Sequence, residues 1–369
     1  MDNIKGINEL FFELIRVAIG TQDSLSYIPK PKEWKALYDM AKKQSIVGVC
    51  FAALQQLGAD ADEGFARIGM SEMQYLTWMG MAAKIQQKNE VVNQKCVELQ
   101  AKLSADGISS SILKGQGVAA LYCEHLRGLR QSGDIDIYVS CGRKKAIEYA
   151  RNLQGAVDWD YKHLHLKVFD NIEVEMHYVP EVFLNLRKNK KLQVWFKEHR
   201  EQMFAQNEHF VTPSLDVNLF YILLHTYRHF LYEGVGLRQL IDYYFVLSNP
   251  MVIDSMRYNT MNTIKVFEML RFTQGVMWIM KEVFGLDNEY LLCEPDENEG
   301  RYILNEVMTG GNFGHYDERL KDDKITGKKR AIKKILKHNL HLLTHYPADT
   351  LWAPIWIVYH WCWKRMNRI

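Results

Sequence analysis

Two aspartates near the middle of the chain, Asp134 and Asp136, form the pattern that most directly indicates chemistry. They lie in the segment 134–139, DIDIYV, whose alternating side chains predict a β-strand with both carboxylates on one face. Two carboxylates so close together repel each other unless a cation lies between them. Oxygen ligands of this kind suit a hard divalent ion such as Mg²⁺, with water and phosphate oxygens completing its coordination. The pair therefore predicts a metal site.

A second pattern comes about twenty residues earlier, where Lys114, Gly115 and Gly117 follow a short predicted strand at 108–113 and begin a helix. The start of a helix offers free backbone N–H groups and the positive end of the helix dipole to an anion, most often phosphate. Lys114 adds a mobile positive charge. A phosphate-binding turn followed by a metal-binding pair of aspartates indicates an enzyme that transfers a nucleotidyl or phosphoryl group.

A third pattern is a predicted hairpin with one polar face. The segments 163–169 and 172–178 alternate strictly and flank Asp170 and Asn171, which predicts a tight two-residue turn. The polar face of this hairpin consists of His163, His165, Lys167, Glu173, Glu175 and His177. Such a face either borders the site or is simply the solvated side of a two-stranded ribbon.

The segments LKG at 113–115 and RQSGDIDIYV at 130–139 resemble the polymerase-β-type nucleotidyltransferases, and specifically the bacterial group called uncharacterised nucleotidyltransferase family 5. The resemblance extends over about residues 106–314. It implies an α+β fold, in which a small mixed β-sheet core is flanked by N-terminal and C-terminal helical regions. It also implies Mg²⁺-dependent transfer of a nucleoside monophosphate from an NTP, such as ATP, to an acceptor hydroxyl or amine. Two magnesium ions are expected.

The family keeps a third carboxylate in a segment of the form acid, apolar residue, histidine. Glu175-Met176-His177 matches this form, so the resemblance implies that Glu175 completes the metal site with Asp134 and Asp136, with Glu173 as the alternative. The histidines that share the face of Glu175 are expected to border the acceptor rather than hold a structural metal. These histidines are His163, His165 and His177.

The resemblance also implies a set of residues that grip the triphosphate. They are Lys114, Gly115, Gln116, Gly117, Arg130 and Arg238. Gln116 is a departure, because the wider superfamily often has Ser or Gly there, but backbone N–H groups can still bind the phosphates. Arg238 and Asp242 are four apart on a predicted helix, so Arg238 either forms an ion pair there or reaches the nucleotide.

Composition limits the alternatives. The chain has 369 residues, 47% of them hydrophobic and 24% charged, as in an ordinary globular protein of one to three domains. A formal net charge of +2 does not favour a long nucleic-acid footprint. The six cysteines are widely spaced, which predicts reduced, buried thiols. The segment 1–20 resembles an amphipathic helix rather than a signal peptide, and no apolar stretch approaches the roughly 18 residues of a membrane span, so a cytoplasmic location is expected.

The rest of the chain predicts helices on both sides of the core. The expected ranges are an N-terminal helical region at 1–105, the nucleotidyltransferase core at 106–212 and a C-terminal helical region at 213–369. Apolar periodicity predicts a long helix at 71–103, whose buried side includes Met79, a helix at 143–154 that ends at Gly155, and a single helix at 262–284. His225 and His229 are four apart on a predicted helix and are expected to be packed or hydrogen-bonded, since no third zinc ligand is near in sequence.

The C-terminal region combines a basic helix at 319–338 with a tail rich in tryptophan. The helix is expected to bury the apolar stripe Ile332, Ile335, Leu336, Leu340 and Leu343. Basic helix and tail together suit peripheral contact with an anionic membrane. Solvated lysines above tryptophans that form a core or an oligomer interface are the commoner arrangement.

The identity of the acceptor is not indicated by these residues. A small molecule, a saccharide or a protein is the expected acceptor class, and a tRNA-modifying or toxin-like nucleotidyltransferase is the alternative. A non-catalytic binding or scaffold protein with the same fold is a third hypothesis. Retention of all three carboxylates, Asp134, Asp136 and Glu175, favours the enzyme.

Overall fold

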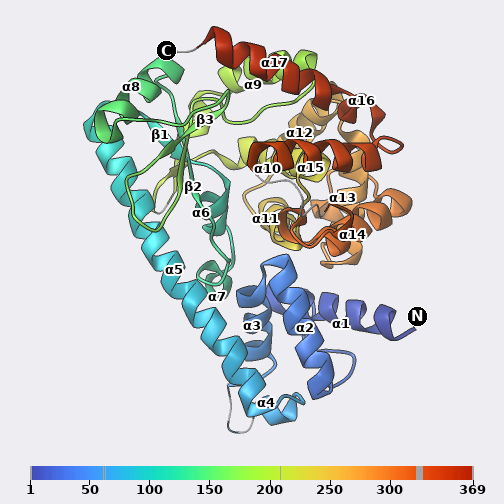
Figure 1. The fold of residues 1–369 in the computed structure, drawn as a ribbon. Coiled ribbons are helices and arrows are strands. Elements are labelled where there is room, and N and C mark those ends of the chain that lie inside the picture. The colour runs from blue at the N-terminus through green and yellow to red at the C-terminus, as the bar shows by residue number, and fades with distance from the viewer. Residues whose placement is uncertain (1, 61, 63, 208, 321–326, 368–369) are drawn as a thin grey trace. The chain divides into compact units, whose positions relative to one another are not determined.

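Figure 1 shows the computed structural model, which describes residues 2–60, 62, 64–207, 209–320 and 327–367. The expected α+β class is confirmed, because most residues are helical and the strands form a four-stranded mixed sheet and a two-stranded ribbon. The chain divides into two compact units, each built from three separate stretches. The first unit comprises residues 1–93, 118–132 and 235–316, and the second comprises 94–117, 133–234 and 317–369. The sequence predicts three consecutive ranges, whereas these units are defined by contacts and combine separate stretches. The three ranges therefore stay a prediction.

The described part of the first unit is helical. Its longer helices are α1 (Asp2–Ile19), α2 (Pro31–Gln44), α3 (Val47–Gln56), the first part of α5 (Glu72–Ala105), α11 (Leu237–Leu247), α12 (Asp254–Val266), α13 (Leu270–Glu282) and α14 (Glu297–Gly310). The short helices α4 (Gly64–Arg67) and α7 (Glu124–Arg127) join them. Helix α1 contacts α2 and α3, and α13 contacts α14.

Two predicted helices of this region illustrate success and failure of apolar periodicity. Helix α5 was predicted at 71–103 and is confirmed, although Met79 is 40% exposed and the neighbouring Trp78 is buried in its place. The single helix predicted at 262–284 is wrong, because the structure has α12 and α13 there. Glu268 adopts a left-handed conformation (φ 56°) between them and ends α12, and no glycine or proline marks this break in the sequence.

The second unit contains the four-stranded sheet. Its order is β1 (Ser110–Ile112), β2 (Ile135–Val139), β4 (Val174–His177) and β3 (His163–Leu166). Strands β2 and β4 are parallel, and the outer pairs, β1 with β2 and β3 with β4, are antiparallel. Helix α8 (Arg143–Gln154) follows β2 as predicted, ends at Gly155 (φ 75°) and contacts β3. One face of the sheet is apolar and buried, through Ile135, Ile137, Val139, Leu164, Leu166, Val174 and Met176.

The turn predicted between β3 and β4 is wrong. The ladder ends at the pair Leu166–Val174, so the connection is the seven-residue loop 167–173 rather than Asp170 and Asn171 alone. A two-residue turn at 170–171 would place His165 opposite Met176. The observed register places His165 opposite Glu175, and directly opposed residues share a face. The polar face expected from the sequence therefore requires the longer loop.

The remaining helices of the second unit are α6 (Lys114–Ala119), which extends into the first unit's range, α9 (Leu186–Glu198), α10 (Leu215–Tyr232), α15 (Gly327–Leu342), α16 (Pro347–Thr350) and α17 (Trp352–Met366). The ribbon is formed by β5 (Ala205–Gln206) and β6 (Val211–Thr212). The apolar stripe expected on α15 is wrong at Leu340, which is 69% exposed. The helix instead buries His338, whose Nε2 bonds the carbonyl of Phe230. The side chain of Ile332 and residues 321–326 lie outside what is described.

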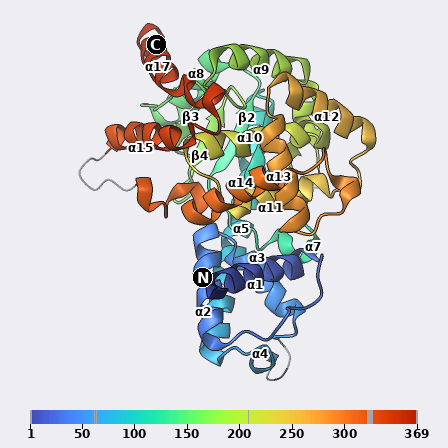
Figure 2. The same ribbon diagram turned by 90° about the vertical axis from the view of Figure 1, so that its right-hand side faces the viewer.

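The tryptophan-rich helix α17 lies next to α8 (Figure 2) and has two different sides. On one side the ring of Trp363 contacts those of Trp159 and Tyr161, and Arg143 lies over it. On the other side Trp361 is 57% exposed. Among the described residues, no helix combines the length and hydropathy needed to cross a bilayer. All six cysteines are unpaired, but only Cys50 and Cys96 are buried, so the expectation of buried thiols is wrong for the other four.

Candidate active site

The strands that carry the predicted carboxylates, β2 and β4, are hydrogen-bonded neighbours, and their register pairs Asp136 with Glu175. Residues paired in this way point to the same face of a sheet, so both carboxylates lie on its polar side. Asp134 directly precedes β2, and the adjacent Asp136 carboxylate together with burial raises the pKa of Asp134. Glu173, the alternative third carboxylate, is exposed in the loop before β4. The geometry thus favours Glu175 over Glu173.

Lys114 approaches the carboxylates from a strained turn. Its backbone (φ 31°) and that of Gly115 (φ 43°) are both left-handed, where α6 begins. A Cβ at Gly117 would lie 2.6 Å from the carbonyl oxygen of Ile112, so only glycine fits there. The turn brings Nζ of Lys114 to 3.0 Å from Oδ1 of Asp136.

The charge on Lys114 is balanced by several carboxylates. Burial alone would lower the pKa of Lys114, but the carboxylates raise it above its usual value, with Asp136 having the largest effect. The other carboxylates that raise it are Asp134, Glu175 and Glu181. Lys114 is therefore protonated and faces more than one negative charge.

His177 is the second cationic partner of the carboxylates. It is fully buried on β4, where its Nε2–H donates to Oδ1 of Asp136 at 2.9 Å and lies 3.4 Å from Oε2 of Glu175. Burial opposes the charged imidazole, but hydrogen bonds to the two carboxylates raise the pKa of His177. Conversely, Lys114 and His177 hold the pKa of Asp136 below its usual range despite burial. His177 and His163 do the same to the pKa of Glu175.

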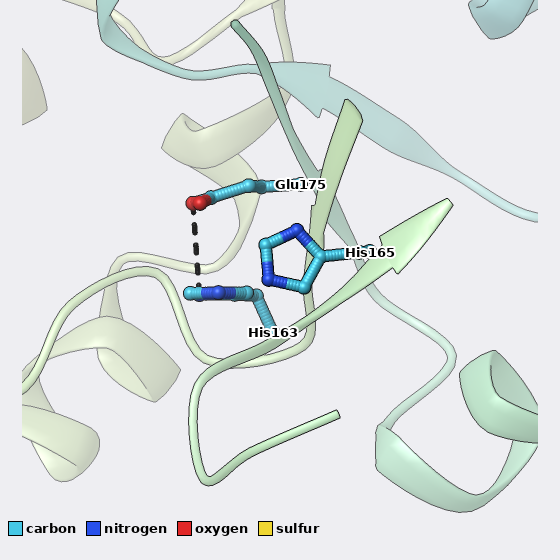
Figure 3. Close-up of side chains that lie close together, drawn as sticks. All are labelled: His163, His165 and Glu175. Carbon is cyan, nitrogen blue, oxygen red and sulfur yellow. Dashed lines mark ion pairs between the residues drawn. The ribbon is translucent and has the colours of Figure 1, made fainter. Parts of the chain in front are cut away.

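Two further histidines from β3 lie on the same polar face. Figure 3 shows His163 and His165 beside Glu175, with Nδ1 of His163 3.6 Å from Oε2 of Glu175. Burial and the neighbouring His177 lower the pKa of His163 to about 4, so its imidazole is neutral at pH 7. In the described chain, two groups of three could hold a metal ion: His163, His165 and Glu175, and Asp136, Glu175 and His177. The structure thus brings together the three expected histidines, Asp136 and Glu175, whereas Asp134 belongs to neither group.

A buried network around Glu181 was not expected from the sequence. Glu181 is fully buried, and its carboxylate lies 3.1 Å from Nε of Arg228, 3.4 Å from Nζ of Lys162 and 3.0 Å from Nδ1 of His225. His229 lies 2.9 Å from Glu233. The hydrogen bond of His225 confirms the expectation that this histidine is hydrogen-bonded. The available sequence signal was a single acid within the apolar run 179–184, VPEVFL.

Arg130, Arg238 and Asp242 belong to the first unit. Nε and Nη2 of Arg130 bond the two oxygens of Asp242 at 2.6 and 2.7 Å, and the hydroxyl of Tyr122 bonds the same carboxylate at 2.8 Å. Nη1 of Arg238 donates to the carbonyl of Gln131 at 2.7 Å. The ion pair of Asp242 is therefore formed with an arginine distant in sequence. Roles for Arg130 and Arg238 in nucleotide binding stay predictions.

The comparison with protein families assigns the class. The model of a family described as "Uncharacterised nucleotidyltransferase" matches residues 30–285, more than half of the chain. The chain belongs to this nucleotidyltransferase family, which confirms the resemblance carried by the LKG and DID segments. The matched range also includes α2, α3 and α5, so it begins well before the sheet. Comparisons with curated proteins and with solved structures returned no match.

Proposed function

We propose that this protein transfers a nucleoside monophosphate from an NTP to a hydroxyl or amine of an acceptor, in a Mg²⁺-dependent reaction. The observation that carries the proposal is the pairing of Asp136 with Glu175 on adjacent parallel strands, with Lys114 3.0 Å from Asp136. Family membership supports nucleotidyl transfer in general. The acceptor class proposed is a small molecule, a saccharide or a protein, and the proposed location is the cytoplasm.

The donor set fits Mg²⁺. Asp136 and Glu175 are paired on β2 and β4, and Asp134 is close enough to Asp136 for their charges to interact, so three carboxylates are offered to a hard divalent cation. Lys114 and His177 both lie against Oδ1 of Asp136, so the carboxylates already attract positive charge. Bound there, Mg²⁺ would stabilise the charge that develops on the phosphates and lower the pKa of the acceptor hydroxyl.

The residues of the chain divide the remaining work. In the transfer, the acceptor oxygen or nitrogen bonds to the α-phosphorus, the bond from that phosphorus to the bridging oxygen breaks, and pyrophosphate leaves. Lys114 and the backbone N–H groups of residues 115–117 would hold the leaving phosphates. Glu175, which is paired with Asp136 on the same face of the sheet, would help to deprotonate the acceptor once the bound ion has lowered the acceptor's pKa. His177 would orient Asp136 through its hydrogen bond.

Thermal melts of the wild type and of the double variant Asp134→Asn with Asp136→Asn test this function. In EDTA the variant loses the repulsion between the two aspartates but also leaves Lys114 and His177 without the carboxylate of Asp136, so its melting temperature there serves only as the baseline for the ligand shift. With Mg²⁺ and the correct NTP at a hundredfold excess over Kd, the wild type should gain about 2.7 kcal/mol and the variant almost nothing. Each of the four NTPs is assayed.

The exposed carboxylate of Glu173 provides the matched control. Glu173→Gln should retain the full nucleotide shift, whereas Glu175→Gln should lose it. No shift of the melting temperature of the wild type with Mg²⁺ and any of the four NTPs contradicts the proposal. A nucleotide shift without product, in a mass-shift screen of acceptors that includes tRNA, would indicate the non-catalytic binding protein instead.

A further inference from the structure

Glu175 lies between two different sets of ligands. In the sheet order β2-β4-β3, Asp136 is its partner on one side and His165 is its partner on the other. His163 is paired with His177 one step along the ladder. The carboxylate of Glu175 can therefore face oxygen ligands from β2 or imidazole ligands from β3.

The imidazole side has the arrangement of a metal site. The candidate ligand atoms of His163, His165 and Glu175 lie within 4.8 Å of one another. Among the described atoms, Nδ1 of His163 is buried and has no hydrogen-bond partner, although Oε2 of Glu175 is 3.6 Å away. That separation suits two atoms that each bind one ion at about 2.0–2.2 Å. His165 is exposed, so its ring can turn toward the same point.

The opposite nitrogen of His163 has a carboxylate partner. Its Nε2 lies 3.9 Å from Oδ2 of Asp160, while Oδ1 of Asp160 accepts from the backbone N–H groups of Lys162 and His163 at 2.7 and 3.0 Å. A ligand histidine in metalloproteins commonly has a carboxylate behind its second nitrogen, which orients the ring and increases its basicity. Asp160 is thus held in position to support His163.

We propose that His163, His165 and Glu175 form a binding site for a first-row transition-metal ion of the zinc type. Two imidazoles and one carboxylate favour Zn²⁺ and its neighbours over Mg²⁺, which prefers oxygen ligands alone. Three protein ligands leave coordination positions open for a further molecule. The inference goes beyond the proposed function and shares only Glu175 with it.

The open side of this site is accessible. His165 also lines a cavity of about 800 Å³ bounded by Asp158 and the loop 166–174. Because the side chain of His165 is exposed, an ion held by the three ligands can be reached from solvent on that side. This agrees with the expectation that His163 and His165 border the acceptor, and it describes an exchangeable ion rather than a structural one.

Titration with Co²⁺, a spectroscopic substitute for Zn²⁺, tests the site in the full chain with Mg²⁺ in excess. The wild type should bind one equivalent and develop the visible absorption of an imidazole-ligated Co²⁺. His165→Ala changes an exposed side chain, so the fold should persist, but Co²⁺ affinity should fall by at least about tenfold. Asp160→Asn should weaken Co²⁺ by about tenfold through loss of the carboxylate behind His163. The control is His125→Ala, an exposed histidine of the first unit, which should bind Co²⁺ as the wild type does.

The double variant Asp134→Asn with Asp136→Asn separates the two sites. It should keep the Co²⁺ absorption, because none of the three ligands is changed. Unchanged affinity in both His165→Ala and Asp160→Asn overturns the inference, and so does loss of the Co²⁺ signal in the double aspartate variant. A Co²⁺ site that depends on His165 in a protein showing no NTP shift would leave the metal site standing and remove the proposed function.

Discussion

Two charged clusters, one in each unit, show how differently buried ions can be arranged. The closed cluster consists of Tyr122, Arg130 and Asp242 in the first unit. Both oxygens of its single carboxylate are occupied by the arginine, and one also accepts the tyrosine hydroxyl. The open cluster consists of Lys114, Asp134, Asp136, Glu175 and His177 in the second unit.

The open cluster has three carboxylates, and among the described residues it contains two cationic groups, Lys114 and His177, that lie against them. Within the described structure, Nδ1 of His177 has no hydrogen-bond partner, and both cations lie against the same oxygen of Asp136. A closed ion pair holds the fold in place, whereas an excess of carboxylates is stable only if another cation can bind. From this difference we expect the closed cluster to stabilise the fold and the open cluster to bind a ligand.

The largest expected effect is on the closed cluster. Arg130→Met should lower the free energy of unfolding by about 3–5 kcal/mol, because it leaves the buried Asp242 carboxylate without its partner. Urea unfolding followed by circular dichroism measures this loss.

The control combines Arg130→Met with Asp242→Asn, which removes both charges and keeps an acceptor for Tyr122. It should recover much of the loss and retain the nucleotide shift. If the double variant is stable but has lost that shift, Arg130 binds the nucleotide and the cluster is not purely structural.

An intermediate effect is expected at Glu181, which lies in the same unit as the open cluster. Its carboxylate is surrounded by its partners Arg228, Lys162 and His225. Burial opposes ionisation, but these partners hold the pKa of Glu181 well below its usual value. Glu181→Gln should cost about 1.5–3 kcal/mol at pH 7. The pKa of a glutamate in the unfolded chain is about 4.3. Because the pKa of Glu181 is lower in the folded protein, its ionisation stabilises the fold above that pH, and this stabilisation is lost as the pH falls below it.

Urea unfolding at a series of pH values measures this dependence. The difference in stability between wild type and Glu181→Gln should therefore be constant near neutrality and shrink below about pH 4.3. A difference that is independent of pH would show that Glu181 acts by packing and not by its charge.

The smallest expected effect is on the open cluster. Lys114→Met removes the ammonium group that competes for Asp136, so Mg²⁺ alone should bind more tightly, by about 1 kcal/mol or roughly fivefold in Kd. The shift caused by the NTP should decrease at the same time, because the phosphates lose a positive partner. Isothermal titration with Mg²⁺, without and with an NTP analogue, measures both quantities.

Lys145→Met, an exposed lysine on α8, is the matched control and should change neither value. If Mg²⁺ alone binds more weakly to Lys114→Met than to the wild type, Lys114 does not compete with the ion for Asp136. Lys114 would then hold the carboxylates in place, and this result would contradict the description of the cluster as open.

Local patterns were enough for several elements of the fold. Alternation at 134–139 predicted β2, and the apolar spacing with Gly155 predicted α8 at its observed bounds. These patterns succeed because each element buries one side, so apolar residues recur every two residues in a strand and about every 3.6 residues in a helix. The same reasoning failed at the β3–β4 turn, at Glu268 and on α15, where a loop, one left-handed residue and a buried histidine interrupt the period without a local signal.

The sequence by itself determined which side chains share a face: Asp134 with Asp136, and His163 with His165. Only the tertiary structure decided which faces meet. The parallel pairing of β2 with β4 brings Asp136 beside Glu175 across a long crossover connection, and Asp242 joins Arg130 from 112 residues away. Alternation sets the direction of a side chain relative to its own strand, whereas the choice of partner strand depends on how the whole chain buries its apolar surface. The type of chemistry could therefore be predicted from the sequence, whereas the partners of each charged residue could not.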